Sequence, residues 1–403
     1  MTLMIFDTKT QNRRDFVSRK ESEVLMYICG PTVYGPSHLG HARSYIIFDV
    51  IRRYLEFQGF EVKVAMNLTD VEDSITRVAR ETNKSVKEVA DANIDSFLRD
   101  MDSLGIKRAD AYPRVTEHIS EIIATIESLI ERSYAYIANG DVFFRVSKTK
   151  SLGMLSHSDF RGMTVDTIAE PEKRENPLDF VLWRRAKEGH PSWSSPWGEG
   201  RPGWHIECFA LSRKYLGEKL DIHCGGVDLK FPHHESEAMI SEAFVEQDWC
   251  NYWLHNGFIT IEQEKMSKSL GNFVQVRDLL DKYPGVVIRL CLLKEQYRNN
   301  VEYDRDCFKN TEEEMNRIGE AISIAKTARN KSSGGKVDTV VNSCRKRFFK
   351  AMDNDFDASE AVRVLMELTE AVHELGHFSS EEGESIIKTY EDFAKILGLH
   401  GLN

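Results

Sequence analysis

Two cysteines, a histidine and a glutamate in this chain are the residue types of a metal site. Cys29 ends a short apolar run, Cys208 ends the segment Gly-Trp-His-Ile-Glu-Cys, and His233 and Glu237 lie four residues apart. Residues at i and i+4 share one face of a helix. Two thiolates, an imidazole and a carboxylate form a suitable zinc ligand set. Free cysteines are usually small hydrophobic core residues, so a packing role is the alternative interpretation.

A histidine pair follows the first of these cysteines. Residues 31–41 end in His38-Leu-Gly-His41 and are predicted to open a helix directly after a strand. Histidines three residues apart share a helix face, and Gly40 between them removes a side chain where a ligand could approach. Helix N-termini attract phosphate, and histidines there can donate hydrogen bonds to phosphate oxygens. Taken alone, such a glycine-containing turn more often has a structural role.

A lysine pair lies much later in the chain. The segment Lys265-Met-Ser-Lys268-Ser-Leu-Gly-Asn272 places two lysines around a loop of small residues. Two flexible cations on such a loop are suited to hold a polyphosphate that changes position. A solvated basic turn is the alternative when this segment is considered by itself.

The elements that would position the first two groups form one unit. Residues 24–29 are an apolar run that ends at the turn signal Gly30-Pro31, which predicts a strand. Apolar residues at helical spacing predict a helix over 42–57, and residues 60–68 predict a second strand. Strand–helix–strand units build doubly wound parallel sheets, in which ligands bind at the carboxyl ends of the strands.

Most of the remaining chain is predicted to be helical. Helical patterns run from residue 85 to about residue 138 and again from residue 289 onward, and residues 220–223 form another short strand candidate. Residues 140–200 show little periodicity and many turn residues, so they are interpreted as an insertion into the first domain.

The C-terminal part is predicted to be a helix bundle. Asp357-Ala-Ser-Glu360 is a capping-box pattern, and apolar residues follow it at alternating intervals of four and three: Ala361, Leu365, Leu368, Val372 and Leu375. Residues 326–350 carry eight basic residues and one acidic residue in a chain whose net charge is −11. This segment could contact a polyanion, and a solvated helix face is the alternative.

The composition limits the class of protein. With 403 residues, 41% hydrophobic and 29% charged, the chain is long enough for two or three globular domains. Its apolar stretches are far shorter than the about 20 residues of a membrane span, and the N-terminus lacks a signal-peptide pattern. Seven cysteines, an odd number without dense spacing, predict a reducing cytosol and no disulfide framework.

The histidine and lysine motifs together resemble the HLGH and KMSKS signatures of class I aminoacyl-tRNA synthetases, about 225 residues apart. Three further segments, Ile-Cys-Gly-Pro-Thr-Val-Tyr, Gly-Trp-His-Ile-Glu-Cys and Phe-Pro-His-His-Glu-x-Glu, are similar to those of cysteinyl-tRNA synthetases. The resemblance to that family covers roughly residues 1–400.

The resemblance implies an α/β fold, with a doubly wound parallel, Rossmann-like catalytic domain that carries an insertion and is followed by a C-terminal α-helical bundle. The implied parts are a catalytic domain of residues 1–115 and 200–250, an inserted connective domain of residues 116–199, a KMSKS-bearing stem-contact region of residues 251–305, and a tRNA-contacting bundle of residues 306–403. Family members commonly continue into a domain that reads the anticodon, and we expect this chain to be a short form without it.

The resemblance also implies a metal and an amino-acid site. One Zn²⁺ per chain, open to the substrate thiolate, would be held by Cys29, Cys208, His233 and Glu237. The cysteine substrate would be bound by Gly30, Thr32, Thr69, Trp204 and His233. The family usually has glycine where this chain has Cys224. We interpret Cys224 as an inert packing residue, and a competing metal ligand is the alternative.

The two signature motifs are assigned to ATP by the resemblance. The implied ATP-binding residues are His38, Gly40, His41, Asp228 and Lys268. The implied catalytic residues, which would stabilise charge rather than act as nucleophiles, are His38, His41, Lys265 and Lys268. Mg²⁺ would accompany the ATP.

The implied activity is that of a cysteine–tRNA ligase. Such an enzyme activates L-cysteine with ATP to cysteinyl-adenylate, releases pyrophosphate, and transfers the cysteinyl group to the 3′ end of tRNA(Cys). We expect a cytoplasmic monomer without a membrane partner. Two alternatives remain: an ATP-dependent ligase that joins cysteine to a small amine, and a non-catalytic tRNA-binding paralog.

Overall fold

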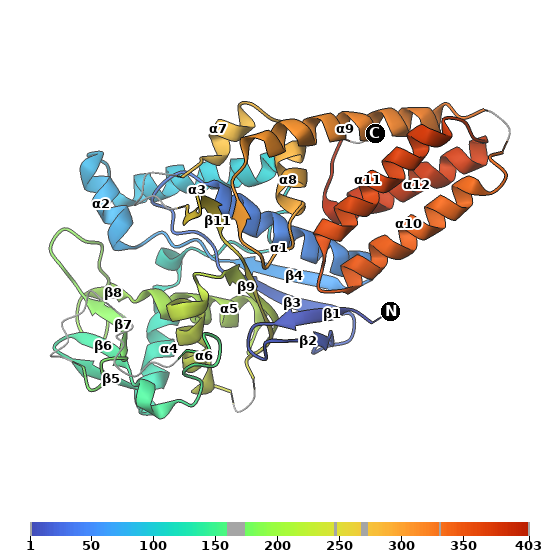
Figure 1. Cartoon of the computed structure of the whole chain (residues 1–403). Helices are drawn as coiled ribbons and strands as arrows, with labels where there is room; N and C mark the ends of the chain where they lie inside the picture. The colour runs from blue at the N-terminus through green and yellow to red at the C-terminus, as the bar shows by residue number, and fades with distance from the viewer. Residues whose placement is uncertain (1, 159–173, 246–247, 267–272, 330–331, 402–403) are drawn as a thin grey trace.

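The computed structural model describes residues 2–158, 174–245, 248–266, 273–329 and 332–401. Figure 1 shows a central parallel sheet with its helices, a smaller lobe formed by the green segment of the chain, and a group of long helices formed by the orange and red C-terminal segment. The predicted fold class, a doubly wound sheet with an insertion and a C-terminal bundle, is confirmed by this arrangement.

Four parallel strands form the central sheet, in the order β10 (Cys250–Asn256), β9 (Leu220–Gly226), β3 (Glu23–Ile28) and β4 (Glu61–Met66). Helix α1 (Leu39–Phe57) connects β3 to β4 and buries Phe48, Ile51 and Leu55 in the core. The predicted strand–helix–strand unit is therefore confirmed. The helix begins before the predicted residue 42 because His38 caps it.

The two faces of this sheet are covered by different helices. Met26 and Ile28 of β3 belong to the same core as α1, whereas Tyr27 packs with residues of α5 (Trp204–Leu216) and α6 (Glu235–Glu242). This alternation follows from the period of two in a strand. A π-helical turn, η4 (Lys230–His234), leads directly into α6. Helices on both faces leave the carboxyl ends of the strands as the open edge.

Helices α2 (Asp73–Glu81), α3 (Val86–Ser103) and α4 (Ile119–Glu131), with the 3₁₀ turn η1 (Val115–Glu117), follow β4. The helical prediction was wrong at its end, because residues 135–138 form strand β5 (Ala135–Ala138). These four residues pair with the next segment of the chain, and a tertiary partner outweighs local helical spacing.

The smaller lobe contains a second, antiparallel sheet in the order β5, β6 (Asp141–Phe144), β7 (Phe180–Arg185) and β8 (Gly200–Pro202), with the 3₁₀ turn η2 (Val146–Lys148) after β6. The sequence showed little periodicity over residues 140–200, and these strands were not predicted from it. Consecutive residues of β6 and β7 are buried, among them Phe143, Phe144 and Trp183, so these short strands do not alternate between apolar and polar residues.

Short elements complete the catalytic part. The hairpin β1 (Met4–Asp7) and β2 (Asn12–Asp15) lies beside β10. Strands β11 (Ile259–Ile261), β12 (Glu264–Lys265) and β13 (Val301–Glu302) form a small sheet, and helices α7 (Val276–Leu280) and α8 (Gly285–Leu293) lie between them in sequence.

The C-terminal bundle consists of α9 (Arg305–Lys326), α10 (Lys336–Asp353), α11 (Ala358–Leu375) and α12 (Ser380–Leu397). The predicted seam of α11 is buried apart from Leu375, which is half-buried, and Asp357 caps the helix by accepting from Glu360 N. Strand β13 is the exception to the predicted all-helical region after residue 289. None of the described helices is long and apolar enough to cross a bilayer.

The basic segment of the bundle is partly neutralised. Arg345 pairs with Asp392 at 2.8 Å, and Arg347 pairs with Glu367. Lys346 and Lys350 are exposed, and no carboxylate within ion-pair distance of either was found among the residues that the structure describes. The charge available to a partner is therefore smaller than the sequence count suggested.

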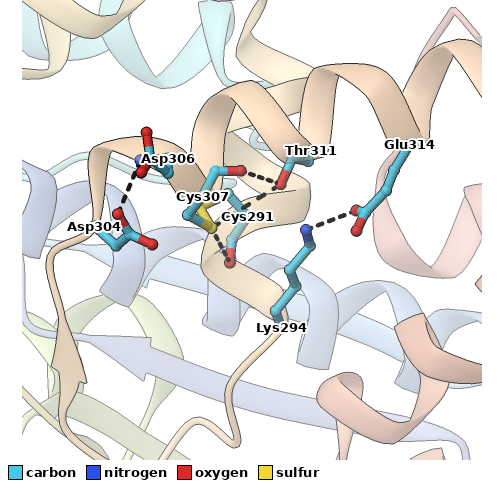
Figure 2. Close-up of a disulfide and its surroundings, with 7 residues drawn as sticks. All are labelled: Cys291, Lys294, Asp304, Asp306, Cys307, Thr311 and Glu314. Carbon is cyan, nitrogen blue, oxygen red and sulfur yellow. Dashed lines mark hydrogen bonds and ion pairs between the residues drawn. A yellow bond between two sulfur atoms is a disulfide. The ribbon is translucent and has the colours of Figure 1, made fainter.

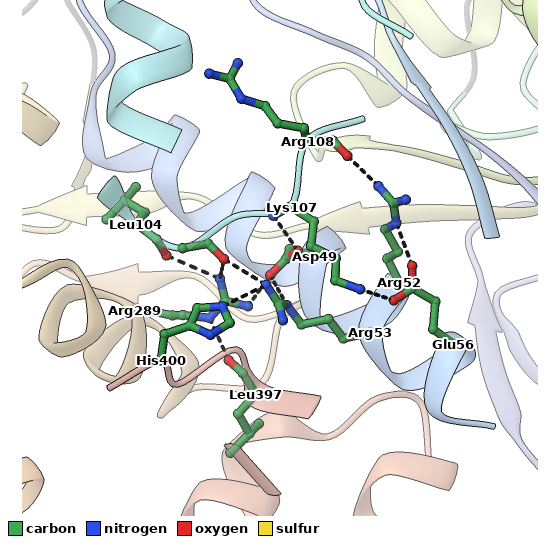
Figure 3. A network of polar contacts seen from close by, with 11 residues as sticks. Asp49, Arg52, Arg53, Glu56, Leu104, Lys107, Arg108, Arg289, Leu397 and His400 are labelled. Carbon is green, nitrogen blue, oxygen red and sulfur yellow. Dashed lines mark hydrogen bonds and ion pairs between the residues drawn. The ribbon is translucent and has the colours of Figure 1, made fainter. Parts of the chain in front are cut away.

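A buried charge network joins the bundle to the part of the chain that holds the central sheet (Figure 3). Asp49 of α1 accepts from Arg53 at 2.7 Å and from Arg289 of α8, and Arg289 Nε donates to the carbonyl of Leu397 at 2.6 Å. Burial alone would raise the pKa of Asp49, but the guanidinium groups of Arg289 and Arg53 outweigh it, so the pKa of this carboxyl is lowered. One carboxylate thus holds α1, α8 and the end of α12 together.

A disulfide between Cys291 and Cys307 links α8 to α9 (Figure 2). The sequence predicted no disulfide framework, and the other five cysteines are indeed free. This pair was not predicted because the two residues are 16 positions apart and meet only where the loop with β13 returns the chain to α8.

Candidate active site

The four sequence-predicted metal ligands meet beyond the carboxyl end of β3. Cys29 follows β3, Cys208 lies on α5, His233 lies in turn η4, and Glu237 lies on α6. Their donor atoms all lie within 4.8 Å of one another, and all four side chains are buried. Cys29 Sγ is 3.7 Å from Cys208 Sγ, and His233 Nε2 is 3.4 Å from Cys208 Sγ and 3.1 Å from Glu237 Oε1.

The chemistry of this donor set fits a divalent cation of the zinc type. Burial raises the pKa of the Cys29 and Cys208 thiols and lowers the pKa of His233, so the protein environment by itself favours uncharged groups. A cation among them reverses this preference, because metal binding stabilises thiolates and neutral imidazole. Two sulfurs, one nitrogen and one oxygen that converge from separate elements are a typical zinc environment.

A second donor set shares two of these residues. Cys29, His223, His234 and Glu237 also have ligand atoms within 4.8 Å of one another. His223 Nε2 lies 3.0 Å from Glu237 Oε2, and His234 Nε2 lies 3.2 Å from Cys29 Sγ. His223 therefore contacts the Glu237 oxygen that His233 does not, and His234 contacts the Cys29 sulfur.

Two more buried histidines orient the cluster from outside. His205 Nδ1 lies 3.0 Å from His233 Nδ1, and His234 Nδ1 lies 2.8 Å from His255 Nε2. If His233 Nε2 binds a metal, its proton sits on Nδ1 and donates to His205, which fixes the ring orientation. Sequence reasoning missed these outer histidines and His223. A usable signal was their density: five of the 13 histidines fall between residues 205 and 255.

A cavity of about 240 Å³ opens beside the cluster. It brings together most of the predicted site residues, namely Cys29, Gly30, Thr32, His38, Gly40, His41, Trp204, Cys208, Asp228, His233 and Lys265. Thr69 and Glu237 do not line it. Thr69 is buried behind Thr32, with which it forms a β-bridge, and Glu237 lies on the far side of the cluster. Lys268 lies outside the described residues.

The wall nearest the cluster is shaped by tight backbone packing. A Cβ on Gly30 would lie 1.7 Å from the carbonyl oxygen of Asn67, so only glycine fits there. Thr69 Oγ1 accepts from Asn67 and donates to the buried Glu207 at 3.3 Å. The Trp204 ring is 39% exposed and stacks on His233 at 4.3 Å between ring centroids. This wall therefore has one aromatic surface held in place by a predicted ligand.

The N-terminus of α1 lines the same cavity. His38 Nδ1 accepts from the backbone N–H of His41, and His41 Nδ1 accepts from the backbone N–H of His38, while the two rings stack at 3.7 Å. Because both Nδ1 atoms are acceptors, each neutral ring carries its proton on Nε2. A Cβ on Gly40 would lie 3.1 Å from the His38 ring, so a larger residue would crowd that ring. The motif thus presents two N–H donors at a helix start.

Lys265 reaches the same cavity from the β11–β12 hairpin. Its Nζ lies 3.1 Å from Asp228 Oδ2 and 4.3 Å from the centroid of the Phe258 ring. Both partners of the ion pair are about half exposed, at 46% and 48% of their side chains. An exposed ion pair is weak, so Lys265 can exchange Asp228 for a more strongly charged anion.

Cys224 lies apart from the metal cluster. In β9 it alternates with His223, and its side chain belongs to the core under α1, whereas His223 points to the cluster. Cys224 is absent from both donor sets found among the described residues. The structure thus supports a packing role.

Comparison with known proteins agrees with this geometry. Residues 15–313 match the family model of the tRNA synthetases class I (C) catalytic domain. The cysteine–tRNA ligase of Thermococcus onnurineus is 45% identical and aligns with 98% of this chain and 85% of its own length. That of Methanococcus maripaludis is 41% identical over 98% of this chain and 85% of its own length.

More distant solved structures share the fold. The methionyl-tRNA synthetase of Mycobacterium tuberculosis superposes with a TM-score of 0.66 at 15% identity, covering 93% of this chain and 89% of that chain. A LeuRS from Agrobacterium radiobacter superposes with a TM-score of 0.71 at 11% identity, covering 96% and 86%. From the matched family model and the similarity over nearly its whole length, this chain belongs to the cysteine–tRNA ligase family of class I tRNA synthetases.

Proposed function

We propose that this chain activates L-cysteine with ATP and esterifies the 3′ end of tRNA(Cys) with the product. The observation that carries the proposal is the buried Cys29, Cys208, His233 and Glu237 cluster beside a cavity that the histidine pair of α1 also lines. A thiol-selective site thereby faces a phosphate-binding site across a space large enough for an amino acid and part of a nucleotide.

Recognition of cysteine takes place at the cluster. Zn²⁺ held by these four residues would bind the substrate sulfur as thiolate and a serine hydroxyl only poorly. Trp204, stacked on His233, limits the room beside the sulfur, and Gly30, Thr32 and Thr69 shape the backbone wall where the amino-acid backbone of the substrate lies. A pocket that discriminated by size alone would gain only about 1–3 kcal/mol per small group.

Activation takes place between the two walls. The carboxylate of cysteine attacks the α-phosphate of ATP, the bond to the β-phosphate breaks, and pyrophosphate leaves with its Mg²⁺. The Nε2–H groups of His38 and His41 donate to oxygens of the α-phosphate region. Lys265 leaves Asp228 for the departing phosphates and acts together with Lys268, while Asp228 faces the nucleotide. Catalysis is positioning and charge stabilisation, and no side chain is a nucleophile.

Transfer needs a second substrate at the same cavity. A ribose hydroxyl of the tRNA 3′ end attacks the cysteinyl carbonyl, and AMP leaves. We propose that the bundle contacts the tRNA backbone through its exposed lysines, and that the chain acts as a cytoplasmic monomer. The family assignment favours this activity over ligation of cysteine to a small amine and over a non-catalytic tRNA-binding role.

One assay tests the proposal: cysteine-dependent exchange of pyrophosphate into ATP, followed by charging of tRNA(Cys). We expect exchange without tRNA and charging when tRNA(Cys) is added. Exchange without any tRNA charging would favour a small-amine acceptor, and no exchange would contradict the proposal.

A further inference from the structure

One buried hydrogen-bond acceptor on the cavity wall has no partner among the residues that the structure describes. Asn256, the last residue of β10, is 3% exposed and lines the active-site cavity. Its Nδ2 donates to the carbonyl of Gly257 at 3.0 Å, which fixes the amide orientation and leaves Oδ1 without a donor. Buried acceptors are normally satisfied, so an unsatisfied one beside a cavity indicates that a bound molecule supplies the donor.

The side chain of Asn256 lies on the opposite face of β10 from the metal cluster. Successive strand residues point to opposite faces. His255 contacts His234 of the cluster at 2.8 Å, whereas Leu254 packs in the core beneath α1. Asn256 shares the face of Leu254. Its oxygen is therefore available to a molecule on the α1 side of the cavity and not to the thiol of the cysteine substrate.

The neighbours of Asn256 indicate which molecule that is. Asn256 pairs in register with Gly226, and Gly226 lies directly under the Asp228 carboxylate, which holds Lys265. Apolar side chains of Phe48, Ile259 and Met266 line the same cavity. Apolar walls with a few fixed polar groups suit a purine nucleoside.

We infer that Asn256 Oδ1 accepts a hydrogen bond from the nucleoside part of ATP, either from the exocyclic amine of adenine or from a ribose hydroxyl. The inference rests on the proposed function and adds a nucleotide-binding residue to it. The inference explains why a buried amide stands at position 256. An apolar residue there would avoid the unpaired acceptor, but it could not bind the nucleoside.

The test measures pyrophosphate exchange by the full chain with ATP and with three analogues that each lack one donor: purine riboside triphosphate, 2′-deoxy-ATP and 3′-deoxy-ATP. We expect Asn256→Ala to raise the KM for ATP about tenfold while the KM for cysteine stays unchanged. For the wild type, the KM for one of the analogues should exceed the KM for ATP by a similar factor. For Asn256→Ala, the KM for that analogue should equal its KM for ATP. Asn251→Ala, on the same strand but outside this cavity, is the matched control and should behave as wild type.

An unchanged KM for ATP in Asn256→Ala would overturn the inference. So would a wild type whose KM rises equally with every analogue, or a wild type that uses all three analogues as well as ATP. The wild-type series keeps the inference falsifiable even if Asn256→Ala fails to fold, because a wild type that uses all three analogues as well as ATP leaves no donor for Asn256. A wild type without any cysteine-dependent exchange contradicts the proposed function instead, so the two failures are distinguishable.

Discussion

The two ends of the active-site cavity are built differently. At the cluster end, Cys29, Cys208, His233 and Glu237 are all buried and come from three separate segments of the chain, so the site is complete only when these segments are folded together. At the end proposed to bind the nucleotide, Lys265 and Asp228 are about half exposed and sit on a hairpin and a loop. A preformed buried site determines which substrate binds, whereas exposed charged groups can move with the charge that develops during the reaction.

The largest effect is expected at the buried end. Cys208→Ser removes one of the two thiolates from the buried four-residue ligand set. A water molecule cannot take the place of this sulfur without changing the geometry of the site. We expect the wild type to hold about one zinc per chain and Cys208→Ser to lose both the zinc and cysteine activation to background. Metal analysis and pyrophosphate exchange measure the two quantities.

Cys344→Ser in the bundle is the matched control, because it removes a buried thiol outside the cluster and should retain both metal and activity. Full cysteine activation by the metal-free protein would show that the cluster does not select the substrate, and the contrast between the two ends would disappear.

A second large effect is expected on the stability of the fold, which supports both ends of the cavity equally. Asp49 is buried against Arg53 and Arg289, and Asp49→Asn leaves two guanidinium groups without their carboxylate. Breaking a buried pair costs about 3–5 kcal/mol of stability. Because the pKa of Asp49 is lowered in the folded state, its stabilisation is present above the unfolded value of about 3.9 and is lost as the pH falls through the folded value.

Denaturant unfolding between about pH 3 and pH 7 measures this effect, and Asp49→Asn should remove the part of the acid dependence that Asp49 causes. Asp102→Asn, which breaks an exposed pair with Arg108, is the control and should cost less than about 1 kcal/mol. An equal loss of unfolding free energy in the two variants would mean that the network does not stabilise the contact between the bundle and the rest of the chain.

At the exposed end, a substitution should lower the rate of cysteine activation rather than the affinity for cysteine. Lys268 lies outside the described residues, and its role comes from the resemblance of its motif. Lys268→Ala should lower the rate of cysteine activation by about 10²–10³, because it removes a donor to charge that grows in the transition state. Cysteine affinity should stay unchanged. Lys282→Ala, an exposed lysine nearby in sequence, should have no effect, and an equal loss of cysteine affinity in Lys268→Ala would contradict the proposed division.

Predictability from sequence also differs between regions. The unit of β3, α1 and β4 was predicted because its apolar spacing is local, and the four ligands were predicted from their segments rather than from spacing. The sheet of the smaller lobe was missed because β6 and β7 are buried on consecutive residues. The outer histidines were missed although their density between residues 205 and 255 was a usable signal. Asn256 was missed because its significance depends on strand register and on a cavity, which no local pattern encodes.

The smallest effect is expected far from the cavity, on the bundle. Of the basic residues in its predicted tRNA face, Arg345 and Arg347 are already paired with carboxylates, whereas Lys346 and Lys350 are exposed. Lys346 and Lys350 can exchange solvent ions for tRNA phosphates at little cost. Each phosphate neutralised adds roughly 0.7–0.9 to the slope of log affinity against log salt. The double variant Lys346→Ala with Lys350→Ala should therefore reduce the salt slope of tRNA charging by about 1–2 and leave pyrophosphate exchange unchanged.

Lys388→Ala offers a matched control, because this exposed bundle lysine is already paired with Asp392 at 3.0 Å and should contribute little to the salt slope. Charging rates of tRNA(Cys) transcript over a range of salt concentrations give the slopes for all three proteins. If the double variant keeps the wild-type slope, the phosphate contacts lie elsewhere, and the exposed face of α10 is only a solvated surface. If exchange falls together with charging, the bundle acts on the cavity itself, and the separation between substrate selection and tRNA positioning does not hold.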